Sequence, residues 1–600
     1  MTTLRPFVFF LFAIASLAFS ARLHANSSLW TAHESDTVQW RHWSPETLAE
    51  AKSSDKPLFF FVAHYGNSLA RAMLSETFQN KTIASTLNDT AVPVLIDVNE
   101  QPEFASLLGL IAYEHFEAND WPTCLWTNTE LAPLNGGSYF PPTDDWGGQG
   151  FLSLARNVAE QWQTRRDEYL GPAKERLAKS LTTQSLSLEE LQASETAFPA
   201  TAFEAEEAPS LPAADLYNYS RILSELEATR AEELQNAMQQ IVSRISSGAG
   251  FDSISGGFFI GSNDTDWKLP LFQKSTIEQA LMLKALSKLN ELDPKSEYEN
   301  LIRLTVSFIK RDLLKSNGLS IQYLDSFATG ETPDMVEGSY YLIDDAQLSS
   351  LPAEAAEAWG LMAEGNLDPN TDILGIYEGL NVPFANNPDI LSPSFDKLRN
   401  KLQKKRADKP SPLSDDTGYT ATNALLVSSL AKASAATGNK TYLKLARSIY
   451  DSILSSAFDQ ADKKLYNSDR KTRSASSLDY AYLAAAALDL HKAIGSNDFL
   501  NTAKKLYSIW QSDKRFLANN PLVSPSGIEG ISLANYHDAP LPSAAAIHLE
   551  NLIELQSADS LPEASALIEA ALSPIPHLAA EHPEKFRSLF ALAKLAQKPN

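Results

Sequence analysis

The fold of the first part of the chain follows from Lys56-Pro57-Leu58-Phe59-Phe60-Phe61-Val62-Ala63. The apolar run from Leu58 to Ala63 offers no polar face, which is typical of a β-strand buried on both sides. Similar runs predict strands at residues 92–98 and 123–127. Helical patterns are expected between these strands, at residues 68–87 and 102–117. Strands and helices that alternate in this way predict a small α/β sandwich.

The pattern changes from residue 214 onward to amphipathic helices, whose Ala- and Leu-rich faces recur at helical spacing. The segment 171–213 is polar and carries several prolines, so we expect it to hold a helix end and an exposed linker. Helices are expected at residues 215–246, 275–293, 297–315, 420–437, 440–456, 477–493, 496–512, 543–557 and 561–573. Hairpins joined by long polar loops favour a closed toroid, and an open α-solenoid is the alternative.

Composition excludes several classes of protein. The chain has 600 residues, too many for one hydrophobic core, so more than one domain is expected. Its apolar share of 44% and charged share of 21% exclude general disorder and a polytopic membrane protein. The net charge of −24 disfavours nucleic acid and anionic lipid as partners. The single cysteine, Cys124, excludes an internal disulfide, a dithiol redox pair and a thiolate zinc cage.

The first 25 residues predict a secretory signal. Arg5 precedes an apolar run at residues 7–19, and small residues follow, so cleavage is expected after Ser20 or Ala25. An uncleaved anchor or a buried helix is the other interpretation, but the run is short for a bilayer span. We therefore expect a secreted or periplasmic protein with no stable membrane insertion once the signal is removed.

Four motifs of the first part occur in a characteristic order: Lys56–Phe61, Met73–Asn80, Trp121-Pro122 and Gly136–Pro142. They resemble the thioredoxin-like domain of the spermatogenesis-associated thioredoxin-domain protein family. The second part of that family is similar to the six-hairpin (α/α)6 toroids of glycosidases and sugar epimerases. The resemblance implies an α/β thioredoxin-like domain at residues 26–170, followed by an all-α (α/α)6 toroid at residues 214–600.

Further motifs carry the resemblance through the second part. They are Gly256-Gly257-Phe258, Trp267, Pro270, Phe272, Lys274, Asp325-Ser326, Glu337–Tyr341, Asp415-Asp416, Asn423, Asp479–Ala481 and Pro542-Ser543.

The redox positions of the family are lost. Its Cys-x-x-Cys is replaced by Asn67 and Ala70, and Cys124 is expected to be a small buried apolar residue. Since disulfide exchange needs a nucleophilic and a resolving thiol, we predict no thiol-disulfide oxidoreductase activity. The resemblance implies a cis proline at Trp121-Pro122 beside a groove that could bind extended polypeptide. A purely structural role for this dipeptide is the alternative.

The toroid supplies the other candidate site residues. Glycoside cleavage needs two carboxyl groups, and the family-matched catalytic candidates are Asp325, Glu337, Asp416 and Asp479. The candidate ligand-binding residues are Trp267, Phe272, Lys274, Tyr341 and Asn423. The family's His-Phe-Glu-Lys core reads Leu271-Phe272-Gln273-Lys274 here, so two proton-moving groups are absent.

Two hypotheses follow from these residues. The first is a redox-inactive, exported protein that binds carbohydrate or polypeptide without catalysis. The second is a glycoside hydrolase or sugar epimerase that uses the toroid carboxylates. Acids that precede helices are also favoured by the helix dipole alone, which would make Asp416 and Asp479 structural. The histidines lack zincin spacing, and no glycine-rich phosphate loop is present, so we expect no metal and no cofactor.

Overall fold

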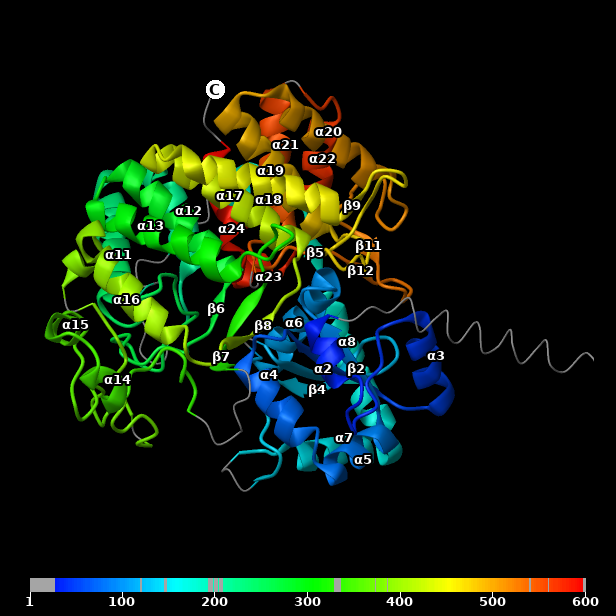
Figure 1. Cartoon of the computed structure of the whole chain (residues 1–600). Helices are drawn as coiled ribbons and strands as arrows, with labels where there is room; N and C mark the ends of the chain where they lie inside the picture. Colours follow the sequence, from blue (N-terminus) through cyan, green and yellow to red (C-terminus); the bar gives the residue numbers. More distant parts are fainter. Residues whose placement is uncertain are drawn as a thin grey trace, which may run out of the picture. The chain divides into compact units, whose positions relative to one another are not determined.

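The computed structural model describes residues 27–118, 121–144, 148–192, 198, 203, 209–328, 336–372, 374–385, 387–538, 541–558 and 560–596. The expected signal at residues 1–25 and the linker residues 193–197, 199–202 and 204–208 lie outside these ranges. The chain divides into two compact units (Figure 1). The first holds residues 1–174, 417–420 and 453–479, and the second holds the rest. Within the described residues, no helix is both long and apolar enough to cross a membrane.

The first unit is built on a four-stranded sheet of order β2-β1-β3-β4. Strand β1 (Leu58–Ala63) pairs parallel with β2 (Val92–Asp97) and antiparallel with β3 (Thr123–Thr127), and β3 pairs with β4 (Pro133–Gly137). Every residue of β1, β2 and β3 is buried, as their unbroken apolar runs predict. The three predicted strands are therefore confirmed.

Side chains alternate across this sheet and meet helices on both faces. Phe59 and Phe61 pack in one core with residues of α5 (Lys81–Thr90) and α7 (Phe151–Thr164). Phe60 points to the other face, where its ring meets Phe104 of α6 (Pro102–Phe116) edge to face, with ring centres 5.6 Å apart. The predicted α/β sandwich and thioredoxin-like fold class are thus confirmed.

The helix predicted at residues 68–87 is interrupted. It consists of α4 (Ser68–Ala72), a π-helical turn (Met73–Thr77) and α5. The break has a local cause, because Asn80 caps α5 by accepting hydrogen bonds from the backbone N–H groups of Thr82 and Ile83. The backbone of Asn80 is extended, with φ of −66° and ψ of 117°, so one helix cannot run through it.

The second unit is a ring of helices. Within its described residues, six helices form the inner ring: α10 (Ala213–Ile222), α12 (Thr276–Leu292), α17 (Thr420–Thr437), α19 (Ser477–Ile494), α21 (Ala544–Ser557) and α24 (Arg587–Leu595). The helices that lie outside it are α9 (Leu188–Gln192), α11 (Ala228–Ser247), α13 (Ser296–Phe308), α18 (Lys440–Ser456), α20 (Asn497–Ser512) and α22 (Ala564–Leu572). Figure 1 shows them from cyan-green to red.

Contacts between neighbouring inner helices fix the order of the ring. The helix α10 packs on α12, α21 packs on α24, and α24 packs back on α10. Asn290 of α12 donates to the carbonyl of Ala436 in α17, and Lys432 of α17 pairs with Asp489 of α19 at 3.4 Å. Asn551 joins α21 to the backbone of α19. The ring is therefore closed, which confirms the predicted (α/α)6 toroid and excludes the open solenoid.

Burial distinguishes the two layers of the ring. Inner helix α12 is buried on nearly all sides, whereas outer helix α11 buries one stripe that includes Leu234, Met238 and Ile245. A short three-stranded sheet, β6 (Lys274-Ser275), β7 (Tyr323–Ala328) and β8 (Pro412–Asp415), lies at the amino-terminal ends of the inner helices, because β6 runs directly into α12 and β8 ends just before α17.

Several predicted helix limits differ from the structure. The helix expected at residues 215–246 is split into α10 and α11, and the one expected at 297–315 ends as a π-helical turn at Leu313. The expected linker contains the end of α8 (Arg166–Ser180) and the short α9. The helices that were not predicted include α24 and α16 (Asp396–Arg406). Both matter below, because α24 closes the ring and α16 carries the candidate site.

Candidate functional site

A cavity of about 460 Å³ lies beside α16 in the second unit, with α14 (Asp345–Ser349) on another wall. Its surface mixes aliphatic groups with one aromatic ring and several polar or charged groups. The lining residues are Ile254, Tyr340, Leu342, Ile343, Asp344, Ala346, Gln347, Ser350, Leu351, Leu402, Lys405, Arg406, Asp408 and Lys409. Mostly apolar walls with a few polar groups are typical of small-molecule sites.

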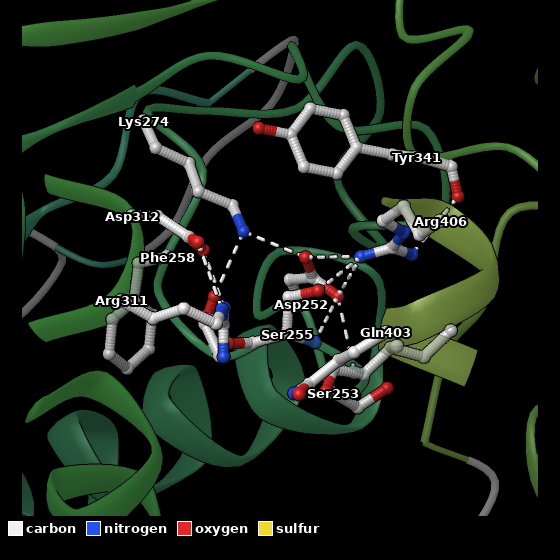
Figure 2. Close-up of polar contacts among 12 residues, drawn as sticks. Asp252, Ser253, Ser255, Phe258, Lys274, Arg311, Asp312, Tyr341, Gln403 and Arg406 are labelled. Atoms are coloured by element: carbon white, nitrogen blue, oxygen red, sulfur yellow. Dashed lines mark hydrogen bonds and ion pairs between the residues drawn. The ribbon is translucent and has the colours of Figure 1, made fainter. Parts of the chain in front are cut away.

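One wall residue, Arg406, connects the cavity to a buried ionic centre (Figure 2). Its Nη1 donates to both carboxylate oxygens of Asp252, at 3.0 and 2.8 Å, and to Oγ of Ser255 at 2.9 Å. Its Nη2 donates to the carbonyl of Tyr341 at 3.1 Å. Lys274 approaches the same carboxylate from the other side, with its Nζ 2.8 Å from Oδ2 of Asp252. One carboxylate therefore holds two cations.

Burial makes this centre electrostatically strong. The exposed fraction is 0% for Lys274, 4% for Asp252 and 5% for Arg406. Burial alone would raise the pKa of Asp252, but Arg406 and Lys274 outweigh it and hold that pKa well below its usual range. Burial lowers the pKa of Lys274 to about 8, although Asp252 partly opposes the shift. Asp252 is thus a carboxylate under all ordinary conditions.

The Asp252 carboxylate also organises its own turn. Its Oδ1 accepts hydrogen bonds from the backbone N–H groups of Ile254 and Ser255, both at 3.1 Å. Gly256 and Gly257 follow with φ of +82° and +85°, and a Cβ atom on Gly257 would lie 2.5 Å from the ring of Phe308. The Gly-Gly motif is therefore needed for the turn that places Asp252.

Aromatic rings surround the Lys274 ammonium. Its Nζ lies 4.6 Å from the ring centre of Phe259, 4.5 Å from that of Phe308 and 4.9 Å from that of Tyr341. The same Nζ donates to the carbonyl of Gly256 at 2.9 Å. Lys274 is thus enclosed by protein groups, and its connection to the cavity runs through Asp252 and Arg406.

Other polar groups of the cavity wall are held in place by backbone contacts. Lys405 donates from Nζ to the carbonyl of Ser350 at 3.0 Å, and Lys409 donates to the carbonyl of Ser339 at 2.9 Å. Asp344 caps α14 through a capping box with Gln347. The cavity therefore presents charged groups whose positions are set before any ligand arrives.

The predicted ligand-binding residues of the toroid lie in the protein core. Trp267 and Phe272 are 0% and 1% exposed, and Phe272 stacks on Tyr341 with ring centres 6.0 Å apart. Asn423 is fully buried and bonds both backbone groups of Ser320. The structure brings Lys274, Phe272 and Tyr341 together, as one aromatic cluster behind the cavity.

The predicted catalytic carboxylates occupy separate positions. Asp325 is a buried residue of β7 and accepts a hydrogen bond from the N–H of Phe327. Asp479 forms a reciprocal cap with Ser476 at the start of α19. Asp416 is exposed and its backbone carbonyl accepts from Lys315, while Glu337 is half-buried near Tyr377. None of these four lines the 460 Å³ cavity, and their catalytic role stays a prediction.

Two carboxyl groups that the sequence reasoning missed have raised pKa values. Burial raises the pKa of Glu278, in the first turn of α12, to about 7. Its Oε2 is buried and has no hydrogen-bond partner among the described residues. Burial also raises the pKa of Asp538 to about 6, although the side chain accepts from both backbone N–H groups of Ser543 and Ser588. Both groups sit at amino-terminal ends of inner helices, and only Glu278 had a sequence signal, its position in the first turn of a predicted helix.

Asp252 and Arg406 were also missed by sequence reasoning. They are separated by 154 positions in the chain, and no local motif links them. The available signals were weak, namely an acid four residues before the Gly-Gly motif and an arginine at the end of a helix that was not predicted.

The first unit carries the lost redox positions. Asn67 caps α4 by accepting from the N–H of Ala70 at 2.7 Å, and it donates to the carbonyl of Trp121 at 2.9 Å. The Trp121-Pro122 peptide bond is cis, as the resemblance implied. Cys124 is buried, and burial raises the pKa of its thiol well above the usual value. Asn67 therefore joins the helix start to the proline loop without any thiol.

The part of the chain that the structure describes contains no cluster of three or more His, Cys, Asp or Glu side chains that could hold a metal ion. Two of the histidines, His537 and His548, are buried, and burial lowers the pKa of each to about 3.

Comparisons with known proteins extend over most of the chain. Residues 20–182 match the Thioredox_DsbH family model, described as a protein of unknown function, DUF255. Human spermatogenesis-associated protein 20 is 24% identical over 599 residues, which cover 89% of this chain and 75% of the human protein. An uncharacterised protein of Caenorhabditis elegans is 25% identical over 574 residues, covering 87% of this chain and 78% of its own.

Solved structures of sugar-processing enzymes are similar at low scores. A cellobiose 2-epimerase from Bacillus thermoamylovorans has a TM-score of 0.39 and 10% identity, over 70% of this chain and 92% of its own. A GH76 α-mannanase from Bacteroides thetaiotaomicron has a TM-score of 0.34 and 12% identity, over 64% of this chain and 84% of its own. The resemblance seen in the motifs is confirmed: the chain is similar to the spermatogenesis-associated thioredoxin-domain proteins over most of its length, its thioredoxin-like unit matches the Thioredox_DsbH model, and Asn67 and Ala70 stand at the Cys-x-x-Cys positions.

Proposed function

We propose that this chain is an exported, redox-inactive binding protein whose toroid unit takes a carbohydrate ligand without catalysis. The observation that carries the proposal is the 460 Å³ cavity, in which Arg406 is fixed by the buried centre of Asp252 and Lys274, and Lys405 is fixed by the carbonyl of Ser350. Carbohydrates present both C–H faces and hydroxyl groups, so a site for them needs apolar surface beside preset hydrogen-bonding groups.

The cavity wall contains both kinds of group. Tyr340 offers an aromatic ring, and Leu342 and Leu402 offer aliphatic surface. Lys405 and Gln347 offer donors for hydroxyl groups. The first unit supports the redox-inactive part of the proposal, because Asn67 and Ala70 stand where a dithiol would be and Cys124 is buried.

Binding is tested with the mature protein against a panel of mono- and oligosaccharides by isothermal titration calorimetry. We expect Tyr340→Ala and Lys405→Ala each to weaken binding about tenfold, since a lost ring contact or charged hydrogen bond is worth about 1.4 kcal/mol. Lys404→Ala is the matched control, because Lys404 is the exposed neighbour on the same helix and does not line the cavity. Equal affinity in all three variants would remove the cavity as the site.

Polypeptide is the alternative ligand class, at the Trp121-Pro122 loop of the first unit. An unfolded-peptide panel in the same titration separates the two, with Trp121→Ala as the variant. Export is tested on protein made in its native host: the mature amino terminus should begin after Ser20 or Ala25. An intact Met1 would contradict the signal.

A second function, carbohydrate-active catalysis, is favoured by one observation. Glu278 has a buried carboxyl oxygen without a partner among the described residues and a pKa raised to about 7, which are properties of a general acid. The predicted carboxylates Asp325, Glu337, Asp416 and Asp479 are the candidates for its counterpart. Aryl-glycoside hydrolysis or sugar epimerisation that Glu278→Gln abolishes would establish the enzyme and refute the non-catalytic proposal.

A further inference from the structure

A second cavity, of about 220 Å³, lies within the ring of inner helices. Five of the six inner helices line it: α10, α12, α17, α21 and α24. Lys288 of α12 and Lys432 of α17 lie in the second halves of their helices, Lys284 lies at the middle of α12, and Leu595 ends α24. This cavity therefore lies toward the carboxyl ends of the inner helices, away from the β6-β7-β8 sheet and from Glu278 at their amino-terminal ends.

Cations outnumber anions in this cavity. Its charged lining residues are Arg221, Lys284, Lys288, Lys432, Glu291 and Glu550. Even when Asp489 is added, as the partner of Lys432 at 3.4 Å, the cations exceed the carboxylates by one. A cavity with a net positive charge is unexpected in a chain with a net charge of −24.

Lys284 is the source of the excess charge. It is only 6% exposed, and it lines the cavity. Among the described residues its ammonium makes no hydrogen bond or ion pair, and its close contact is the ring of Tyr217, 5.0 Å from Nζ to the ring centre. By contrast, Arg221 pairs with Glu550 at 3.0 Å and Lys288 with Glu291 at 3.3 Å. The charge of Lys284 helps to lower the pKa values of Asp489 and Glu550, but no direct ion pair joins it to either carboxylate among the described residues. A buried ammonium that faces a cavity without a direct partner is stabilised when an anion enters.

The pKa of the Tyr217 phenol is shifted by the same cations. Burial raises the pKa of a tyrosine, and that of Tyr217 is nevertheless lowered because Lys284, Arg221 and Lys432 outweigh burial. The cations thus act together at the point where the Tyr217 side chain meets the cavity.

We propose that this cavity binds a small oxyanion, of the size and chemistry of inorganic phosphate. Lys284 supplies the uncompensated charge, and Arg221 supplies a planar donor group that fits two oxygens of one anion. The volume of 220 Å³ is ample for one phosphate group, since a site for a single water needs only about 10–15 Å³ on the same measure. The site is independent of the carbohydrate cavity and of the catalytic alternative.

Calorimetric titration of inorganic phosphate into the full mature chain, in a buffer free of other oxyanions, tests the site. We expect saturable binding with one phosphate per chain, at least tenfold weaker in Lys284→Gln. Lys310→Gln is the matched control, because Lys310 is an exposed lysine of the same unit that does not line the cavity, and it should bind as the wild type does. No saturable binding in the wild type, or equal weakening in both variants, would overturn the proposal.

A second variant carries a prediction of opposite sign. Glu550→Gln removes the carboxylate that competes for Arg221, so phosphate binding should become at least threefold tighter. This variant decides the question if Lys284→Gln does not fold, and weaker binding in Glu550→Gln would overturn the proposal. Titration with glucose 6-phosphate then distinguishes free phosphate from a phosphate group on a sugar: binding of only the ester shows that the group arrives on a carrier.

Discussion

Replacing Asp252 by asparagine tests the buried ionic centre most directly. Asp252→Asn keeps the shape of the side chain and removes its charge, which Arg406 and Lys274 both hydrogen-bond. Arg406 keeps its contacts with Ser255 and Tyr341, but two buried cations then share no carboxylate. The centre changes from a compensated cluster into a repulsive one.

The expected loss is about 3–5 kcal/mol of unfolding free energy at pH 7, the range for removing one partner of a buried pair. The loss depends on pH, and its sign follows from Lys274, whose folded pKa of about 8 is held up partly by Asp252. In Asp252→Asn this pKa falls further, so the lysine is already neutral in the folded variant at lower pH. Between that lower pKa and pH 8, Lys274 of the variant is protonated in the unfolded state but not in the folded state, so raising the pH stabilises the variant and not the wild type. The loss of unfolding free energy should therefore be larger at pH 6 than at pH 9.

Urea unfolding followed by circular dichroism, at pH 6, 7 and 9, measures both quantities. Asp389→Asn is the matched control, because Asp389 is an exposed aspartate of the same unit, and its effect should stay within about 0.5 kcal/mol. A loss below about 1 kcal/mol in Asp252→Asn at pH 7, or a loss that grows with pH, would refute the electrostatic account of this centre.

Three further outcomes are expected. Glu278→Gln should stabilise the protein relative to the wild type by at most about 3 kcal/mol above pH 7, and should not stabilise it at pH 4.5. The folded-state pKa of Glu278, about 7, exceeds its unfolded-state pKa, so the wild type loses stability as pH rises through the folded-state value. Equal melting-temperature differences at pH 4.5 and 8 would contradict this expectation. Asn67→Ala should lower the unfolding free energy by about 1–2 kcal/mol and speed hydrogen exchange in α4, because it removes the helix cap and the hydrogen bond to Trp121. Unchanged exchange in α4 would argue against the cap. Cys124 should react with Ellman's reagent only after denaturation, and a thiol that reacts within seconds in the native protein would show that the burial is wrong.

The sequence predicted the parts of the fold that depend on local periodicity. The strands at residues 58–63 and 123–127 and the helices at 420–437 and 440–456 have the limits that their patterns indicated. The helix at residues 68–87 was predicted too long, because its apolar period continues through a break that Asn80 imposes by capping. Periodicity reports which face is buried, and it is less informative about where a backbone hydrogen-bond ladder stops.

The candidate site was predicted only in part, for a different reason. Lys274 was found through a motif resemblance, but Asp252 and Arg406 meet it only after the toroid has closed around the turn at Gly256 and Gly257. Contacts between segments so far apart in the chain produce no characteristic residue spacing that a sequence pattern could reveal. The raised pKa of Glu278 likewise arises from burial, which no single residue encodes.

The seam between α10 and α24 has a consequence for how the protein is made. These helices lie near opposite ends of the second unit's stretch of chain, so the ring lacks its last member until α24 has been synthesised. Until then the apolar flanks of α10 and α21 that α24 will cover stay open to solvent and to chaperones. A stop codon placed just before Arg587 should therefore yield a chain that aggregates as it leaves the ribosome, because the ring cannot close without α24.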